Sequence, residues 1–481
     1  LIVVLTGSLL LTSIFNMPKE YALFALIIAS STLLSTIIGM QFVGGSVKGF
    51  DEALGVMRIL NRALLATVIL AAGLVGILAY LTLPRIQALA SFASVAMGFV
   101  TALAVLYVTQ YFTHYTYPPV RNIARQALLS ASNVIVAGYS YGLLSAAPII
   151  FIVAASLGLS FWLGYLYIPP YGIDGGVFGT ALASVGLLSL AGIVISLDSY
   201  GPVSDNANGL VEMVGMGDDV RRVTDILDSV GNTYKAVTKG YAIASAGLAS
   251  LVLFIGFIYE VVRSMGLDVN GALAYVNVVN PALIIGALLG ASLVYLFSSR
   301  TLMAVGNAAG ELVEEVRRQF RERPGILRGV EKPDYGRAID VVTRHALREF
   351  MAPALMAVII PVATGLILGW VALVGLILGV ILVGFPRALL MANAGGAWDN
   401  AKKFIEAGLD PALGGKNSPA HRNAVIGDVV GDPFKDTTGP SLNPLIKVVN
   451  TVSIVFAPLV ALVSLASPIS HIIYLLASSL L

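Results

Sequence analysis

Long apolar runs, separated by shorter polar stretches, continue through the whole chain. An apolar run of about 18 or more residues can cross a bilayer as a helix. Residues 1–15 are apolar but short for a full span, so they indicate a partial first helix. Ten complete spans are predicted at about 22–43, 63–83, 88–112, 135–168, 175–197, 236–262, 273–297, 351–369, 370–392 and 445–478. The predicted fold class is an all-α, polytopic helical bundle forming one integral-membrane domain over 1–481.

Composition supports this interpretation. The 481 residues are 57% apolar and only 12% charged, whereas a soluble domain carries roughly a quarter charged residues. The sequence has no cysteine, which removes disulfides, thiolate metal ligands and cysteine nucleophiles. A net charge of +2 without a basic cluster argues against nucleic acid as a partner. Neither a P-loop nor an HExxH motif is present, which argues against a P-loop ATPase and that class of metalloprotease.

Basic residues are distributed unequally between alternate loops. Most of them fall in five longer segments, predicted as loops at about 44–62, 113–134, 198–235, 299–350 and 393–443. The positive-inside rule places these segments in the cytoplasm and the C-terminus outside. Within them, the mixed charges of 311–349 indicate a solvated helix extension followed by a loop.

Four polar clusters occur next to predicted spans, at their cytoplasmic ends. They lie in the segments 197–215, 231–240, 393–406 and 427–447. In 427–447, a continuous α-helix would place its charged residues on one stripe, since residues three and four apart share a face. Charge beside a membrane helix is costly unless it has a function. We therefore expect the four clusters to converge on one polar site near the cytoplasmic surface.

The residue types in these clusters indicate the chemistry. Carboxylates without cysteine or paired histidines favour a hard cation, and Mg²⁺ typically joins carboxylates to substrate phosphates. Interspersed lysines supply positive charge for phosphate oxygens. This combination favours hydrolysis of a phosphoanhydride by water. Spacing alone leaves a rival open, a secondary transporter of an anion or divalent cation that performs no hydrolysis.

The four motifs resemble a known family. They are ISLDSYGPVSDNANG, GNTYKAVTKG, NAGGAWDNAKKFIEAG and GDVVGDPFKDTTGPSLN, and they are similar to those of membrane-integral pyrophosphatases. The resemblance implies a sixteen-helix, all-α homodimer that binds Mg²⁺-pyrophosphate in a cytoplasmic funnel. It also implies that hydrolysis drives ion transport across the membrane, with protons pumped out of the cytoplasm.

The resemblance assigns roles to individual residues. It implies catalytic roles for Asp205, Lys435 and Asp436, with Asp436 positioning and deprotonating the attacking water. Metal ligation is implied for Asp205, Asn232, Asp399, Asp428 and Asp432. Substrate contact is implied for Lys402 and Lys435, with Lys239 in the coupling region below the substrate. Lys447 is expected at the ion gate, and Lys235 with Thr238 indicates the K⁺-independent, proton-pumping type.

One part of the family pattern is missing from these 481 residues. The acidic loop with its DxxxDxxGKxE and DNVGD patterns does not occur, and the family's first five and a half helices would precede Leu1. The expectation is an N-terminally truncated chain that would be inactive as a fragment.

Overall fold

The computed structural model describes residues 2–45, 52–266 and 275–466. Within these ranges the regular structure is helical, and ten helices are long and apolar enough to cross a membrane. These ten correspond one for one to the predicted spans, of which 273–274 and 467–478 lie outside the described residues, and the all-α membrane fold is confirmed. The first helix, α1 (Ile2–Ile14), has 13 residues and is shorter than a span.

The chain forms two compact units. Unit 1 contains Leu1–Ile258 and Phe385–Lys435, and unit 2 contains Tyr259–Gly384 and Asp436–Leu481. Two long helices, α9 (Asp218–Met265) and α13 (Trp370–Glu406), contribute to both units. The single membrane domain expected from the sequence stays a prediction.

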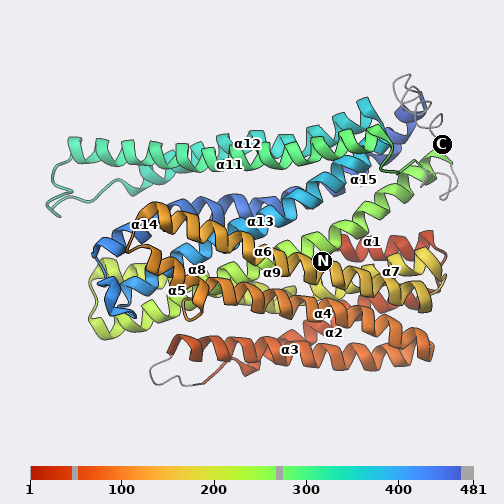
Figure 1. Ribbon diagram of the computed structural model, residues 1–481, viewed down its shortest axis with the longest axis horizontal. Coiled ribbons are helices and arrows are strands. Elements are labelled where there is room, and N and C mark those ends of the chain that lie inside the picture. Colours follow the sequence, from red (N-terminus) through yellow and green to blue (C-terminus); the bar gives the residue numbers. More distant parts are fainter. Residues whose placement is uncertain (1, 46–51, 267–274, 467–481) are drawn as a thin grey trace. The chain divides into compact units, whose positions relative to one another are not determined.

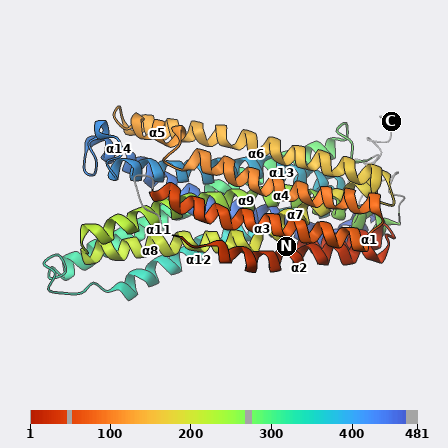
Figure 2. The same ribbon diagram turned by 90° about the horizontal axis from the view of Figure 1, so that it is seen from below.

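Unit 1 holds most of the helices. Besides its parts of α9 and α13, it contains α1, α2 (Lys19–Gly39), η1 (Met40–Phe42), α3 (Glu52–Thr82), α4 (Arg85–Thr113), α5 (Pro118–Gln126), α6 (Ala131–Tyr167), α7 (Gly172–Ser189), α8 (Ala191–Val214), η2 (Pro411–Leu413) and α14 (Pro419–Asp432). Helices α4, α6 and α7 lie side by side (Figure 1, Figure 2). A side chain at Gly179 or Gly186 of α7 would overlap the backbone of α6 at Ser160 or of α4 at Val95. Small residues thus let these helices approach closely, as is common in membranes.

Unit 2 is built around the antiparallel pair α11 (Pro281–Glu322) and α12 (Tyr335–Leu368), which Figure 1 shows side by side. Helix α15 (Gly439–Ala466) packs against α12. Asn280 and Asp334 cap α11 and α12, because each side chain accepts a hydrogen bond from a backbone N–H in the first turn. The turn between these helices, at 323–334, matches the predicted helix extension and loop in 311–349.

Several segments predicted as loops are helical instead. Residues 198–214 belong to α8, 218–235 to α9, 299–310 to α11, and 393–406 and 419–432 to α13 and α14, while α5 lies inside the predicted loop 113–134. Their place on the cytoplasmic side stays a prediction, and their helical structure has a physical reason. Hydropathy reports which residues suit hydrocarbon, whereas a helix satisfies its own backbone and continues into water where its sequence allows.

The continuous α-helix that the sequence predicted over 427–447, with its charged stripe, is interrupted in the structure. Helix α14 ends at Asp432, and Pro433–Thr438 form a π-helical turn (η3) before α15 begins at Gly439. Pro433 has no N–H and its ring crowds the preceding turn, so regular i→i−4 bonding cannot pass through it unchanged. The π-helical turn therefore interrupts the regular α-helical spacing on which the expected stripe depends.

Candidate functional site

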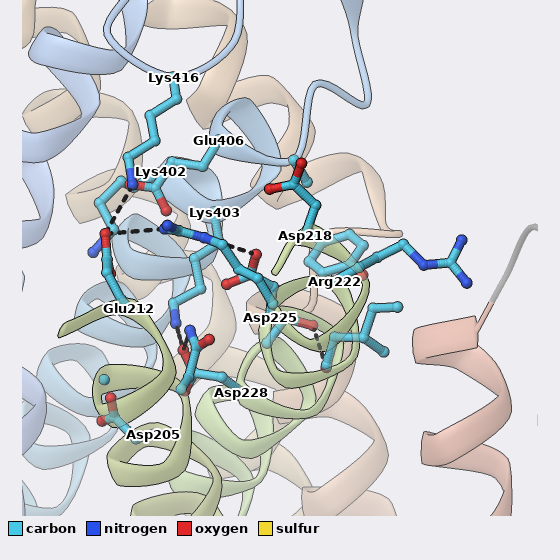
Figure 3. Close-up of a pocket in the computed structure, with 17 residues that line it drawn as sticks. Asp205, Glu212, Asp218, Arg222, Asp225, Asp228, Lys402, Lys403, Glu406 and Lys416 are labelled. Carbon is cyan, nitrogen blue, oxygen red and sulfur yellow. Dashed lines mark hydrogen bonds and ion pairs between the residues drawn. The ribbon is translucent and has the colours of Figure 1, made fainter. Parts of the chain in front are cut away.

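A polar cavity of about 540 Å³ opens at one end of unit 1 (Figure 3). Helices α8, α9 and α13 supply most of its wall, and the loop between α13 and α14 and Tyr115, between α4 and α5, supply the rest. Its charged and amide lining comprises Asp205, Asn208, Glu212, Asp218, Arg221, Arg222, Asp225, Asp228, Lys402, Lys403, Glu406 and Lys416. Two of the four predicted polar clusters, 197–215 and 393–406, therefore line one cavity.

Trp398 fixes the part of α13 that carries the candidate site. Its indole is fully buried among α5, α6 and α14, and Nε1 donates a hydrogen bond of 2.8 Å to the Val134 carbonyl. Glycines make room for this ring, because a side chain at Gly138 or Gly427 would contact it. A large ring held by packing and by one hydrogen bond leaves little rotational freedom. Asp399 follows directly, so its position is set by its neighbour.

Asn400 fixes the same turn from the other side. Its Nδ2 donates to the Thr113 carbonyl at 2.6 Å and to Thr233 Oγ1 at 3.0 Å, which ties α13 to α4 and α9. These contacts are buried, where an unpaired amide would be costly. The Trp-Asp-Asn sequence thus places one carboxylate between two structural anchors.

The buried cluster beside the cavity alternates carboxylates and ammonium groups. Lys435 Nζ lies 2.7 Å from Asp399 Oδ2, 3.3 Å from Asp428 Oδ1 and 2.7 Å from Asp432 Oδ1. Lys402 forms an ion pair with Asp428, and its Nζ lies 3.5 Å from Asp399 Oδ1. Asp399, Asp428 and Lys435 are buried, whereas the side chain of Asp432 is half-exposed. Two lysines thus bridge three carboxylates that could not remain ionised together without compensating charge.

Asp228 is a member of the site that the sequence analysis missed. It is buried on α9, forms an ion pair with Lys403, and its Oδ2 accepts a hydrogen bond of 3.4 Å from Asn208. Its position carried a signal, since it lies four residues before Asn232 and seven before Lys235 and so shares their helix face. Its ion-pair partner Lys403 follows Lys402 in the third motif, and the resemblance assigned it no role.

Lys235 lies in a second group formed by α8 and α9. Its Nζ is 2.5 Å from Asp205 Oδ2 and 3.2 Å from Asn232 Oδ1. One turn further, Thr238 Oγ1 donates to Asp198, also on α8. Lys239 Nζ donates to the Lys435 carbonyl at 2.6 Å, which connects α9 to the π-helical turn η3.

Two predicted functional residues belong to unit 2. Asp436 is in the π-helical turn directly after Lys435, and the partly buried Lys447 is on α15. Their roles, and the roles of the residues in unit 1, stay predictions.

The donor set of unit 1 suits a hard cation held together with a ligand. Five carboxylates share four lysines, namely Asp205, Asp228, Asp399, Asp428 and Asp432 with Lys235, Lys402, Lys403 and Lys435. Oδ1 of Asp228 and Oδ1 of Asp399 are buried without a hydrogen-bond partner, which is unusual for buried polar atoms. In the described part of the chain, no three carboxylate or imidazole groups gather as a metal site. Mg²⁺ often needs only one or two carboxylates, with phosphate oxygens and water completing its shell, and the residues present fit that arrangement.

Comparison with known proteins supplies independent findings. The model of a family described as inorganic H⁺ pyrophosphatase matches residues 2–456. The chain is 50% identical over 480 residues to the K(+)-insensitive pyrophosphate-energized proton pump of Pyrobaculum aerophilum, covering 97% of this chain and 65% of that protein. It is 44% identical over 459 residues to a pump of the same name from Methanosarcina mazei, covering 95% and 65%. It is 39% identical over 464 residues to a putative K(+)-stimulated pyrophosphate-energized sodium pump of Clostridium tetani, covering 94% and 64%. The chain therefore spans about 65% of the length of these relatives.

Proposed function

The chain belongs to the inorganic H⁺ pyrophosphatase family, and on this premise we propose that it hydrolyses Mg²⁺-bound pyrophosphate and couples the reaction to proton transport across the membrane. The observation that carries the proposal is the pairing of Lys402 and Lys435 with Asp399 and Asp428. A diphosphate can accept hydrogen bonds from the two ammonium groups, while the released carboxylates face its metal ion. Alternating charge of this kind suits a metal-bound polyanion better than a bare anion.

The roles of the residues follow from their charge and position. Lys402 and Lys435 bind phosphate oxygens, with Lys239 joined to the backbone of Lys435. Asp399, Asp428 and Asp228 offer oxygen atoms to Mg²⁺, together with Asp205, Asn232 and Asp432. When bound, Mg²⁺ supplies neutralisation of the charge that develops on the phosphate oxygens. Water attacks one phosphorus atom, the bridging P–O bond breaks, and the Asp436 carboxylate accepts the proton of the water.

Transport uses groups beyond the substrate cavity. Lys447 on α15 acts at the ion gate, since an ionisable residue in a membrane helix commonly marks an ion path. The cavity faces the cytoplasm, since Arg221, Arg222, Lys402 and Lys403 line it and basic residues favour the cytoplasmic side of a membrane. Protons are pumped out of the cytoplasm. The functional assembly is a homodimer in the lipid bilayer.

K⁺ independence follows from Lys235. Its ammonium lies among the oxygens of Asp205 and Asn232, where a monovalent cation would otherwise provide the positive charge. Thr238, one turn away, keeps Asp198 hydrogen-bonded. Two relatives named K(+)-insensitive proton pumps support this branch of the family for the chain.

The test uses membrane vesicles that contain the protein. Addition of Mg²⁺-pyrophosphate is expected to release phosphate and to acidify the vesicle lumen, equally with and without K⁺. Asp436→Ala is expected to abolish both signals, and Arg344→Gln, which removes an exposed ion pair on α12, is the matched control. Wild-type phosphate release from Asp436→Ala would overturn the assignment of Asp436. Pyrophosphate-driven flux without phosphate release would instead identify a secondary transporter.

A further inference from the structure

Glu212, near the end of α8, binds two cations at once. Its Oε1 lies 2.9 Å from Arg221 Nη2 on α9 and 3.0 Å from Lys416 Nζ in the loop between α13 and α14. All three side chains line the cavity, and Figure 3 shows Glu212 reached from two sides. Elements that are far apart in sequence are therefore joined through one carboxylate.

These three residues lie at the outer part of the cavity wall. The side chains of Glu212, Lys416 and Arg221 are 52%, 44% and 34% exposed, whereas those of Asp228 and Lys403 are 2% and 16% exposed. Ion pairs in water contribute little free energy, because solvent screens the charges and long side chains lose freedom. The outer contacts can therefore exchange with another anion far more easily than the buried pairs can.

The loop that carries Lys416 is held in place at its base. His421 Nε2 lies 2.8 Å from Glu406 Oε1, and Ser418 Oγ donates to the Leu413 carbonyl at 2.8 Å. Just before Lys416, Gly414 and Gly415 have φ of +76° and +69°, values that L-residues adopt only with strain. The glycine turn thus presents the lysine to the cavity from a fixed position.

We propose that Glu212, Arg221 and Lys416 form an entry clasp for a phosphate-bearing anion. Glu212 acts as an internal competitor that occupies the two cations when the cavity holds no substrate. An incoming Mg²⁺-diphosphate displaces Glu212 from Arg221 and Lys416, opens the clasp and then moves inward to Lys402 and Lys435. The inference rests on the proposed function for the identity of the anion, and it adds the residues that govern capture.

The clasp predicts opposite changes in KM when its carboxylate and its cations are neutralised. Glu212→Gln keeps the shape and removes the competing charge, so KM for Mg²⁺-pyrophosphate is expected to fall by about two- to fivefold, the range that exposed charge pairs support. Lys416→Gln and Arg221→Gln are expected to raise KM by a similar factor. They should also weaken the dependence of kcat/KM on salt, because capture would involve less charge.

Arg125→Gln is the matched control. Arg125 forms an exposed ion pair with Asp410, which is on the same loop as Lys416, yet neither residue lines the cavity. Calorimetric binding of Mg²⁺-imidodiphosphate, a diphosphate analogue that is not hydrolysed, provides a measurement that needs no turnover. Tighter binding to Glu212→Gln and weaker binding to Lys416→Gln, with Arg125→Gln unchanged, would support the clasp.

Two results distinguish failure of the clasp from failure of the proposed function. If the wild-type protein hydrolyses pyrophosphate while Glu212→Gln and Lys416→Gln bind the analogue like Arg125→Gln, the clasp is wrong and the proposed function stands. If the wild-type protein releases no phosphate, the proposed function fails. The opposite shifts in affinity for the analogue would still decide the clasp.

Discussion

Lys435 Nζ lies 2.7 Å from Asp399 Oδ2, although the two residues are 36 positions apart in the sequence. Both side chains are buried, and each charge therefore depends on the other for compensation. The contact joins the Trp-Asp-Asn turn of α13 to the π-helical turn η3, directly after α14. The candidate site is thus a set of interdependent charges, and single substitutions in it should have effects beyond the atoms they remove.

The first prediction concerns Asp399. Asp399→Asn preserves size but removes one carboxylate that Lys402 and Lys435 share, and with it an oxygen that we propose as a Mg²⁺ ligand. The kcat/KM for pyrophosphate is expected to fall more than about tenfold, as is usual when a metal site loses a supporting group. Phosphate release across a Mg²⁺ titration measures the effect. Asp410→Asn, on the adjacent loop and outside the cavity wall, should remain near the wild-type value. Equal activity in the two variants would contradict the assignment.

The second prediction compares two glycines of α6. A methyl group at Gly138 would overlap the Trp398 indole, whereas nothing lies within 4 Å of the corresponding position at Gly158. Gly138→Ala is expected to destabilise the protein by about 1–3 kcal/mol through overpacking, and Gly158→Ala should be neutral or slightly stabilising because alanine favours helix. Thermal unfolding in detergent measures both. Similar melting temperatures for the two variants would show that Trp398 can move without cost.

The third prediction is a double-mutant cycle on Asp228 and Lys403. Lys403→Met leaves Asp228 as a buried and uncompensated charge, and breaking such a pair costs about 3–5 kcal/mol. The double variant Asp228→Asn/Lys403→Met removes both charges and should regain much of the stability lost in Lys403→Met. Thermal unfolding of the two single variants and the double variant measures the coupling. Additive losses would show that the two groups do not compensate each other.

The fourth prediction concerns Lys235. Lys235→Ala removes the ammonium that lies among the Asp205 and Asn232 oxygens. Phosphate release by this variant is expected to require K⁺, because a monovalent cation can replace the missing charge there. Wild-type protein, and Lys19→Ala with its exposed position on α2, should respond equally in K⁺ and choline buffers. Full activity of Lys235→Ala without K⁺ would remove Lys235 from this role.

The sequence predicted the spans well and their ends poorly. Apolar runs of bilayer length identify ten membrane helices because hydrocarbon tolerates little else. The same signal placed 198–235 and 393–443 in loops, whereas α8, α9, α13 and α14 extend through most of both. Charge beyond the hydrocarbon does not end a helix. Pro433 shows the converse, because it begins a π-helical turn that interrupts the α-helix within 427–447. Hydropathy alone does not predict this interruption.

Sequence alone determined the class of protein, the four polar motifs and the type of chemistry that carboxylates and lysines support. These depend on composition and spacing, which local physical rules connect to helices and to hard cations. Tertiary structure decided which charges compensate one another, as in Asp399 with Lys435, Asp228 with Lys403, and Glu212 with Arg221 and Lys416. The lysine partner of a carboxylate can lie 175 residues away, as for Asp228 and Lys403. Only the packing of helices brings such groups within Coulombic reach, and pairing then depends on distances and burial that no one-dimensional pattern contains.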